Sequence, residues 1–278
     1  MRITHKTIQS SMTKTGIGVH RGKPATVRLH AAPVGHGIVF YRTDKPGEVR
    51  VCPESIKAAN RAAILAANGV EIWTPEHLLA AGNALGITNL KIEIDQDEVP
   101  ILDGSSHPWV EALSDCIDQQ VSCLALSPSA PVMCEHGNAQ VLVLPADTPR
   151  YTYVLSYPGT PMGTQAASIE LTPDGFITQI SKARTFGLRD ELEPLLAQGL
   201  AQGVDLSNVL AVEADGYSSP LRYDNEPARH KLLDMIGDFA LLGQPLCAHV
   251  IGVRSGHALN VDAVIQLSLQ RSQCEPSE

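Results

Sequence analysis

The sequence predicts an α+β fold made of two halves that pack on one another. Segments of alternating or β-branched apolar residues recur along the whole chain, and each half also contains amphipathic helical segments. A stretch rich in proline and serine, residues 124–131, is typical of a linker. We therefore expect an N-terminal α+β domain at residues 1–125 and a C-terminal α+β domain at residues 126–278.

The composition excludes several classes of protein. With 30 acidic against 21 basic residues, the formal charge is −9, so we expect no nucleic-acid partner. No apolar run approaches the roughly 20 residues of a membrane span, and the first residues lack an apolar signal core. We therefore expect a cytoplasmic protein without a transmembrane segment. The cysteines form no CxxC pair and are expected to be reduced; they are Cys52, Cys116, Cys123, Cys134, Cys247 and Cys274.

Strands are predicted where short apolar runs lie between glycine, proline and aspartate residues. Such runs occur in both halves, although no sequence repeat of fixed period connects them. The predicted strands cover residues 27–30, 37–41 and 91–95 in the first half, and residues 141–144, 151–157, 167–172 and 250–253 in the second.

Two helices are predicted in the first half. One begins at Thr74, a plausible N-cap, followed by Pro75 at the first helical position and by Glu76, which favours the positive end of the helix dipole. The other follows Pro108 and extends to Ile117 along one apolar face.

Three further helices are predicted in the second half. The first runs from Pro173 to about Ala183, and the second from Pro227 to Leu242, with Gly243 as the C-cap residue. An amphipathic helix is expected from Val261 onward.

The densest cluster of polar candidates lies on the second of these helices. His230, Asp234 and Asp238 are each four residues apart, so they share one stripe of the helix. An imidazole and a carboxylate one turn apart can bind a divalent metal, but the same spacing also produces ordinary surface ion pairs. Because most residues between 232 and 236 are apolar, an unpaired carboxylate here would be costly, which favours metal binding.

Two other segments carry candidate residues. His77, at the start of its helix, is a candidate third metal ligand, and the adjacent Glu76 is a candidate general base. His257 follows a glycine just after a predicted strand, where it could act as a general acid. Taken alone, each pattern is equally compatible with a residue of no catalytic role.

Six segments in one order are more specific than any single motif. Together they resemble the bacterial UDP-3-O-acyl-N-acetylglucosamine deacetylase family, the zinc amidases of lipid A synthesis. The matching segments are residues 15–23, 74–81, 98–105, 181–187, 221–234 and 255–260.

The resemblance implies a catalytic role for several residues. Glu76 matches the base that activates the attacking water, and His257 matches the histidine that protonates the leaving amine. Asp238 matches the carboxylate that orients this histidine, and Thr185 matches the hydroxyl that holds the oxyanion. The implied ligands of Zn²⁺, with Fe²⁺ as the alternative metal, are His77, His230 and Asp234.

The resemblance also implies a substrate, a UDP-linked acylated amino sugar from which acetate is removed in the committed step of lipid A synthesis. Phe186, Lys231 and His20 match substrate contacts. The implied fold has two similar two-layer α/β-sandwich halves with the active site between them, and we expect a monomer.

Alternatives remain at this point. A diverged relative acting on another N-acyl amino sugar is one, because the sequence departs from the family pattern near Arg61, Pro75, Gly203 and Pro227. A non-haem iron oxygenase is another, although its carboxylate usually follows the first histidine by two residues. A non-catalytic α+β binding module is the third, and the negative charge argues against an RNA partner for it.

Overall fold

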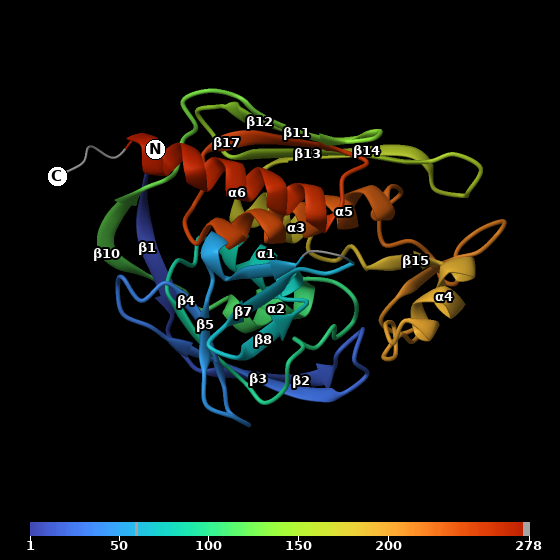
Figure 1. Ribbon diagram of the computed structural model, residues 1–278, viewed down its shortest axis with the longest axis horizontal. Coiled ribbons are helices and arrows are strands. Elements are labelled where there is room, and N and C mark those ends of the chain that lie inside the picture. Colours follow the sequence, from blue (N-terminus) through green and yellow to red (C-terminus); the bar gives the residue numbers. More distant parts are fainter. Residues whose placement is uncertain (59–60, 275–278) are drawn as a thin grey trace.

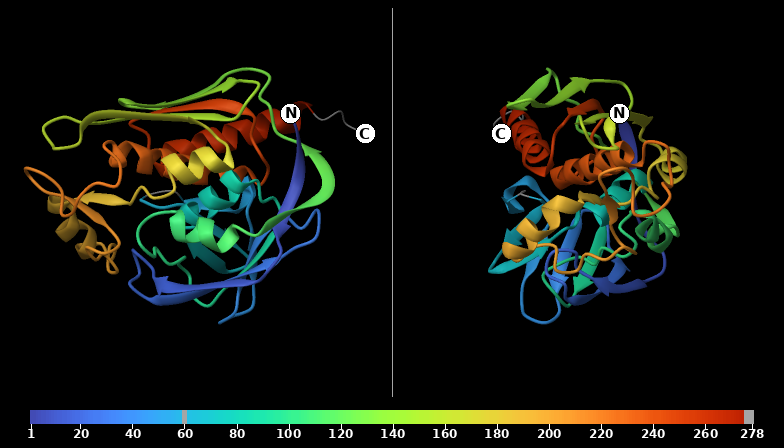
Figure 2. Two further views of the ribbon diagram at one scale, coloured as in Figure 1. Left: turned by 180° about the vertical axis from the view of Figure 1, so that it is seen from behind. Right: turned by 90° about the vertical axis from the view of Figure 1, so that its right-hand side faces the viewer.

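The computed structural model describes residues 1–58 and 61–274, with the backbone alone for residues 271–274. Two five-stranded sheets lie on the outside, and the longer helices lie between them (Figure 1, Figure 2). Cys274 falls outside the residues whose side chains are described, and the other five cysteines are free. None of the helices in this part of the chain is long and apolar enough to cross a membrane.

The first sheet is formed by the N-terminal half, from β2 (Met12–Ile17), β3 (Pro24–Ala31), β4 (Ile38–Arg42), β5 (Glu48–Arg50) and β9 (Leu90–Ile94). The strand order is β2-β3-β9-β4-β5, with β4 and β9 parallel and the other neighbours antiparallel. Along β3, Val27 and Leu29 are fully buried whereas Arg28 is exposed. This alternation is that of a sheet with one face on the core and one in water.

The second sheet is formed by the C-terminal half, from β11 (Val132–His136), β12 (Ala139–Pro145), β13 (Arg150–Tyr157), β14 (Gly163–Glu170) and β17 (Ala248–Val253). Its order is β11-β12-β17-β13-β14, and only β13 and β17 are parallel. Both sheets thus place their five strands in the chain order first, second, fifth, third and fourth. The α+β class and the likeness of the two halves are confirmed, although the sequence shows no repeat.

The helices between the sheets are α1 (Glu76–Leu85), α2 (His107–Leu113), α3 (Pro173–Gln179), α5 (Glu226–Phe239) and α6 (His257–Cys274). The central strand β9 is preceded by α1 and followed by α2, and β17 is flanked by α5 and α6 in the same way. Helix α5 packs on α1, α6 and β13. Helix α1 is buried along nearly its whole length, and apart from Glu76, His77 and Asn83 its residues are apolar or glycine.

Smaller elements complete the two halves. A two-stranded antiparallel ribbon consists of β1 (Arg2–Ile8) and β10 (Cys116–Leu124). A three-stranded sheet precedes α1 and contains β6 (Ile56–Ala58), β7 (Ile64–Ala67) and β8 (Val70–Trp73). Between α3 and α5 lie β15 (Phe186–Leu188), α4 (Leu192–Ala197) and β16 (Leu210–Val212), at the right-hand end of Figure 1. Short 3-10 helices cover residues 53–55, 189–191 and 240–242.

The predicted N-cap role of Thr74 is wrong. Helix α1 begins at Glu76 with Pro75 as its N-cap residue, and Thr74 has a positive φ of 55°. The Thr74 hydroxyl donates instead to the Glu98 carboxylate at 3.0 Å. A long-range partner therefore overrides the local capping pattern.

Other predicted helix boundaries shift for tertiary reasons. Helix α2 ends at Leu113, and Ile117 pairs with β1 as part of β10. Helix α3 ends at Gln179, before a segment that contacts the first half of the chain. Helix α6 begins at His257 rather than near Val261. The predicted end of α5 is confirmed in outline, because the 3-10 turn that follows it ends at Gly243 in the left-handed conformation.

Helices α1 and α5 approach so closely that one position admits only glycine. A Cβ atom added to Gly237 on α5 would lie 2.2 Å from the Glu76 carbonyl oxygen and 2.9 Å from the Glu76 Cα on α1. These obstacles are backbone atoms, which cannot rotate away. The Gly237 position therefore sets the distance between the two helices.

The close contact predicts a large effect of one methyl group. Gly237→Ala should lower the free energy of unfolding by about 3 kcal/mol, because the helices must separate to relieve the overlap. Gly82→Ala on α1 is the matched control, since its added Cβ meets no atom within 4 Å and alanine favours a helix by about 1 kcal/mol. Urea unfolding of both variants checks this, and equal stabilities would contradict the close-contact explanation.

Candidate active site

One cavity of about 460 Å³ opens between the halves where α1 meets α5. Nine of the ten predicted site residues line it, although they come from distant segments of the sequence. The tenth, Asp238, lies fully buried behind His257. The nine lining residues are His20, Glu76, His77, Thr185, Phe186, His230, Lys231, Asp234 and His257.

The three predicted metal ligands meet at one point. His77 comes from α1, and His230 and Asp234 come from successive turns of α5. One nitrogen or oxygen atom of each lies within 4.8 Å of the others. The Asp234 Oδ1 atom is 3.2 Å from His230 Nε2 and 3.5 Å from His77 Nε2. All three side chains are buried.

The backbone fixes the orientation of His230. Its Nδ1 lies 3.1 Å from the carbonyl oxygen of Ala183, which can only accept, so Nδ1 carries the proton. The lone pair of Nε2 is then left for a metal, in the arrangement usual for ligating histidines. On α1, the backbone carbonyl of His77 accepts a hydrogen bond from the Ser106 hydroxyl.

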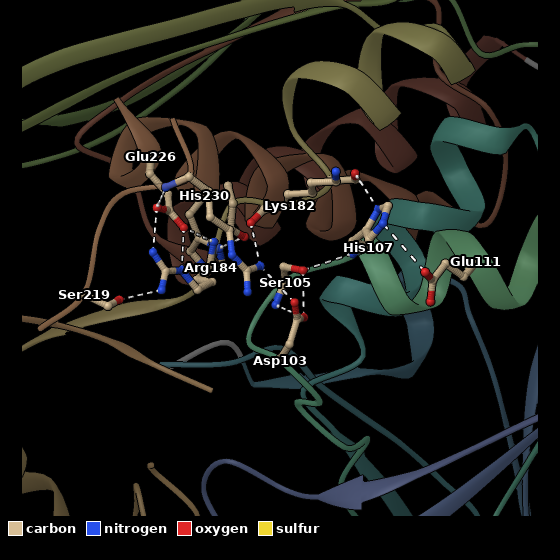
Figure 3. A network of polar contacts seen from close by, with 12 residues as sticks. Asp103, Ser105, His107, Glu111, Lys182, Arg184, Ser219, Glu226 and His230 are labelled. Carbon is tan, nitrogen blue, oxygen red and sulfur yellow. Dashed lines mark hydrogen bonds and ion pairs between the residues drawn. The ribbon is translucent and has the colours of Figure 1, made fainter. Parts of the chain in front are cut away.

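A buried polar network holds the Ala183 carbonyl in place (Figure 3). The adjacent Arg184 donates to Glu226 from its backbone N at 2.9 Å and from its guanidinium Nε at 2.8 Å and Nη2 at 3.0 Å. Glu226 lies one helical turn before His230 on α5 and is fully buried. The helix that carries His230 therefore also anchors the segment whose carbonyl orients it.

The same segment is tied to the N-terminal half at both ends. The Ser106 amide donates to the Ser181 carbonyl at 3.0 Å, and the Thr185 amide donates to the Gly104 carbonyl at 2.7 Å. These bonds explain why the chain leaves α3 at Gln179 and becomes extended. They also place the Thr185 side chain at the cavity.

Electrostatics favour the metal-binding protonation states of His77 and Asp234. Burial lowers the pKa of His77 and keeps the imidazole neutral. Burial opposes ionisation of Asp234, but His230 and Lys231 outweigh it and hold the pKa of Asp234 well below its usual range. The Lys231 ammonium lies 2.7 Å from Asp234 Oδ2. Two imidazoles and one carboxylate form a donor set typical of catalytic zinc.

Glu76 and His257 lie beside this donor set. His257 Nε2 is 3.8 Å from Glu76 Oε1, and His257 Nδ1 is 2.9 Å from Asp238 Oδ1. Burial disfavours the imidazolium, yet the Asp238 carboxylate outweighs it and raises the pKa of His257 to about 9. Burial raises the pKa of Glu76 to about 8, and a divalent cation at the three adjacent ligands would lower this pKa and favour the ionised carboxylate. The geometry thus offers one proton acceptor and one proton donor.

The residues predicted to contact substrate surround the same centre. The Phe186 ring lies 6.1 Å from the His230 ring, edge to face. Lys231 lines the cavity next to Asp234. His20 is buried, and burial lowers its pKa to about 4, so the ring is neutral.

Sequence reasoning missed the apolar wall of the cavity. The spacing of Leu188, Leu192 and Leu195 is a helical signal that could have indicated it. It also missed Asn260, whose side-chain amide donates to Asp238 Oδ2 at 2.8 Å. The apolar lining residues include Ile101, Leu188, Leu192, Leu195, Val204 and Val209.

Two buried polar atoms at the centre lack a protein partner. Glu76 Oε2 and His77 Nδ1 have no hydrogen-bond partner among the residues that the structure describes. Such atoms in a buried site indicate a missing ligand or water. Together with the donor set, they fit the class of metal-dependent hydrolases, in which a carboxylate and a histidine beside the metal commonly act on the substrate.

Comparison with known proteins gives the family. The UDP-3-O-acyl N-acetylglycosamine deacetylase family model matches residues 5–268. The UDP-3-O-acyl-N-acetylglucosamine deacetylase of Thermosynechococcus vestitus is 38% identical over 96% of this chain and 95% of its own length. The proteins of the same name from Leptospira biflexa and Chlamydia abortus are 38% and 37% identical over 93% and 92% of this chain, and over 88% and 94% of their own lengths. The chain belongs to the UDP-3-O-acyl N-acetylglycosamine deacetylase family.

Membership of this family confirms the resemblance stated from the sequence. Deacetylases are hydrolases, so the chain is an enzyme of the hydrolase class. The comparisons do not favour the oxygenase or the binding module that the sequence patterns left open.

The ligand geometry predicts how metal content responds to mutation. His230→Ala should abolish stoichiometric zinc, because it removes a donor nitrogen that the Ala183 carbonyl orients. His249→Ala is the control, since His249 hydrogen bonds to Thr152 on the second sheet, away from the cavity. Metal analysis of the purified proteins checks both, and full zinc content in His230→Ala would refute the assignment.

Proposed function

We propose that this enzyme removes acetate from UDP-3-O-acyl-N-acetylglucosamine, the committed step of lipid A synthesis. The observation that carries the proposal is the buried His77–His230–Asp234 cluster with Glu76 and His257 beside it, at the polar end of a cavity with an apolar wall. A long acyl chain needs apolar surface, and the acetamide needs the polar groups. The relatives' names, UDP-3-O-acyl-N-acetylglucosamine deacetylase, support the same reaction, and these relatives match this chain over most of its length.

We propose zinc as the resident metal, with iron as the alternative. The two nitrogen donors and one oxygen donor suit zinc and leave room for a fourth position. A divalent cation bound there would polarise the acetamide carbonyl and increase the acidity of water.

Glu76 acts as the general base in this proposal. Its Oε2 atom has no partner among the described groups, and its Oε1 atom is 3.8 Å from His257. A carboxylate with a free oxygen in a buried site can accept the proton of the attacking water. The position of Glu76 at the start of α1 places it next to the His77 ligand.

His257 acts as the general acid. Its Nδ1 is held by Asp238, so Nε2 faces the cavity with a proton to donate to the leaving amine. The Thr185 hydroxyl, on a segment fixed by Gly104, is placed to donate to the developing oxyanion. Donation by Thr185 would stabilise the tetrahedral intermediate, and donation by His257 would promote its collapse to products.

The remaining predicted residues act on the substrate. Phe186 provides an aromatic surface, Lys231 a positive charge and His20 a neutral polar contact. The domain boundary at residues 125/126, the monomeric state and the cytoplasmic location stay predictions from the sequence.

The role of Glu76 predicts a loss of turnover without a loss of metal. Glu76→Gln keeps the size of the side chain but cannot take a proton, so acetate release should fall by at least about 100-fold. Glu71→Gln is the control, because Glu71 pairs with Lys57 and Trp73 outside the cavity. Near-normal turnover of metal-replete Glu76→Gln would move the base role to another group.

The Asp238–His257 pair predicts a shift in pH dependence. Activity that needs protonated His257 is lost as the pH rises through the pKa of His257. Asp238→Asn removes the charge that raises this pKa, so the alkaline limb of the pH–rate profile should move to lower pH.

Asp262→Asn serves as the control, because Asp262 lies on the exposed side of α6. An unmoved alkaline limb in Asp238→Asn, with activity retained there and in His257→Gln, would make the pair structural.

A further inference from the structure

Glu98 is a buried carboxylate without a cationic partner. Glu98 is 2% exposed, and its carboxylate takes part in no ion pair among the described residues. Its carboxylate oxygens accept hydrogen bonds from the backbone amide of His20 at 2.8 Å, the backbone amide of Arg21 at 2.7 Å and the Thr74 hydroxyl at 3.0 Å. A buried anion that is bonded only by neutral donors costs stability, and its three bonds to separate segments fit a positioning role.

Two of the three donors, the amides of His20 and Arg21, belong to the tight loop that carries His20. Within this loop, the Gly22 amide donates to the Gly18 carbonyl at 3.0 Å, and the Gly18 amide donates to the Lys23 carbonyl at 3.0 Å. A Cβ at Gly18 would lie 2.2 Å from Glu98 Oε2. Glycine at position 18 thus allows the carboxylate to reach the amides of His20 and Arg21.

The opposite side of the loop contacts the wall of the cavity. The Gln202 amide donates to the His20 carbonyl at 3.2 Å, and the Gly203 amide donates to the Val19 carbonyl at 3.0 Å. A Cβ at Gly203 would lie 2.1 Å from the Gly18 carbonyl oxygen. Figure 1 and Figure 2 show the end of the β2–β3 hairpin next to the segment that follows α4. This segment continues into Val204, which lines the cavity.

Glu98 also reaches the start of α1. Its Thr74 partner immediately precedes Pro75 and Glu76, and Thr74 is held in the left-handed region with a φ of 55°. The Thr74 amide donates to the Ala63 carbonyl at 3.1 Å. The Glu98 carboxylate therefore joins the turn before α1 to the loop of His20. Through that loop it is also connected to residues 202–204 at the wall of the cavity.

We infer that Glu98 is a positioning residue, which holds His20 and the wall segment at residues 202–204 in the geometry that receives the substrate. The inference rests on the proposed function for its substrate. His20 lines the cavity and has an Nδ1 atom without a partner among the described groups. Among the described residues, no hydrogen bond or ion pair joins Glu98 to a metal ligand, to Glu76 or to His257. We therefore expect the loss of Glu98 to affect substrate binding more than the proton transfers.

Glu98→Gln is the direct test. The amide NH₂ would face backbone N–H donors, so at least one bond to the loop is lost at a buried site. We expect KM for UDP-3-O-acyl-N-acetylglucosamine to rise about tenfold, with kcat within about threefold and metal content unchanged. Glu93→Gln is the matched control, because Glu93 pairs with Lys91 and His30 outside the cavity, and its KM should equal that of the wild type.

A double-mutant cycle separates positioning from general destabilisation. If Glu98 acts through His20, the increases in KM caused by Glu98→Gln and His20→Ala should be far from multiplicative when the two are combined. Multiplicative effects, a lowered Tm with unchanged KM, or a loss of metal would each overturn the inference.

Hydrogen exchange provides a readout that needs no substrate. In Glu98→Gln, the amides of residues 18–22 should exchange faster, whereas those of α5 should not change. Absence of acetate release by the wild type would contradict the proposed function alone, while unchanged exchange in the loop would contradict the role of Glu98. If Glu98→Gln does not fold, Thr74→Val removes one of the three bonds, and it should accelerate exchange and raise KM in the same direction.

Discussion

The close contact of α1 with α5 at Gly237 is the constraint on which the site depends. Each helix alone carries an incomplete set of groups, with Glu76 and His77 on one and His230 and Asp234 on the other. Only the absence of a side chain at position 237 lets the Glu76 backbone approach α5 closely enough for the sets to meet. The two similar sheets support this contact from opposite sides, since their buried faces pack on the helices.

The contact concentrates charge in a place from which water is largely excluded. Three carboxylates, Glu76, Asp234 and Asp238, lie within one buried cluster, and Lys231 and His257 are the cations that balance them. Like charges at this density are unfavourable in a protein interior without further positive charge. A divalent cation at the three ligands would supply that charge, so stability and chemistry would be linked through the same ion.

The sequence predicted most of the side chains of the site but little of what orients them. The spacing of His230 and Asp234 is local, and it follows from the period of a helix. The Ala183 carbonyl that orients His230 leaves no signal in the sequence, because every residue has a carbonyl. The N-cap prediction for Thr74 was wrong for the related reason that Glu98, distant in sequence, takes its hydroxyl. Local patterns predict which groups are present, whereas long-range hydrogen bonds decide where they point.

The most direct test of the account is a titration of the metal-free protein with zinc. Acetate release from UDP-3-O-acyl-N-acetylglucosamine is measured at each step, and it shows whether one buried ion is sufficient for activity. The ligand cluster contains one His77–His230–Asp234 set, so activity should rise linearly and saturate at one zinc per chain. Catalysis by the metal-free protein, or saturation only at two or more ions per chain, would contradict a single metal centre between the two helices.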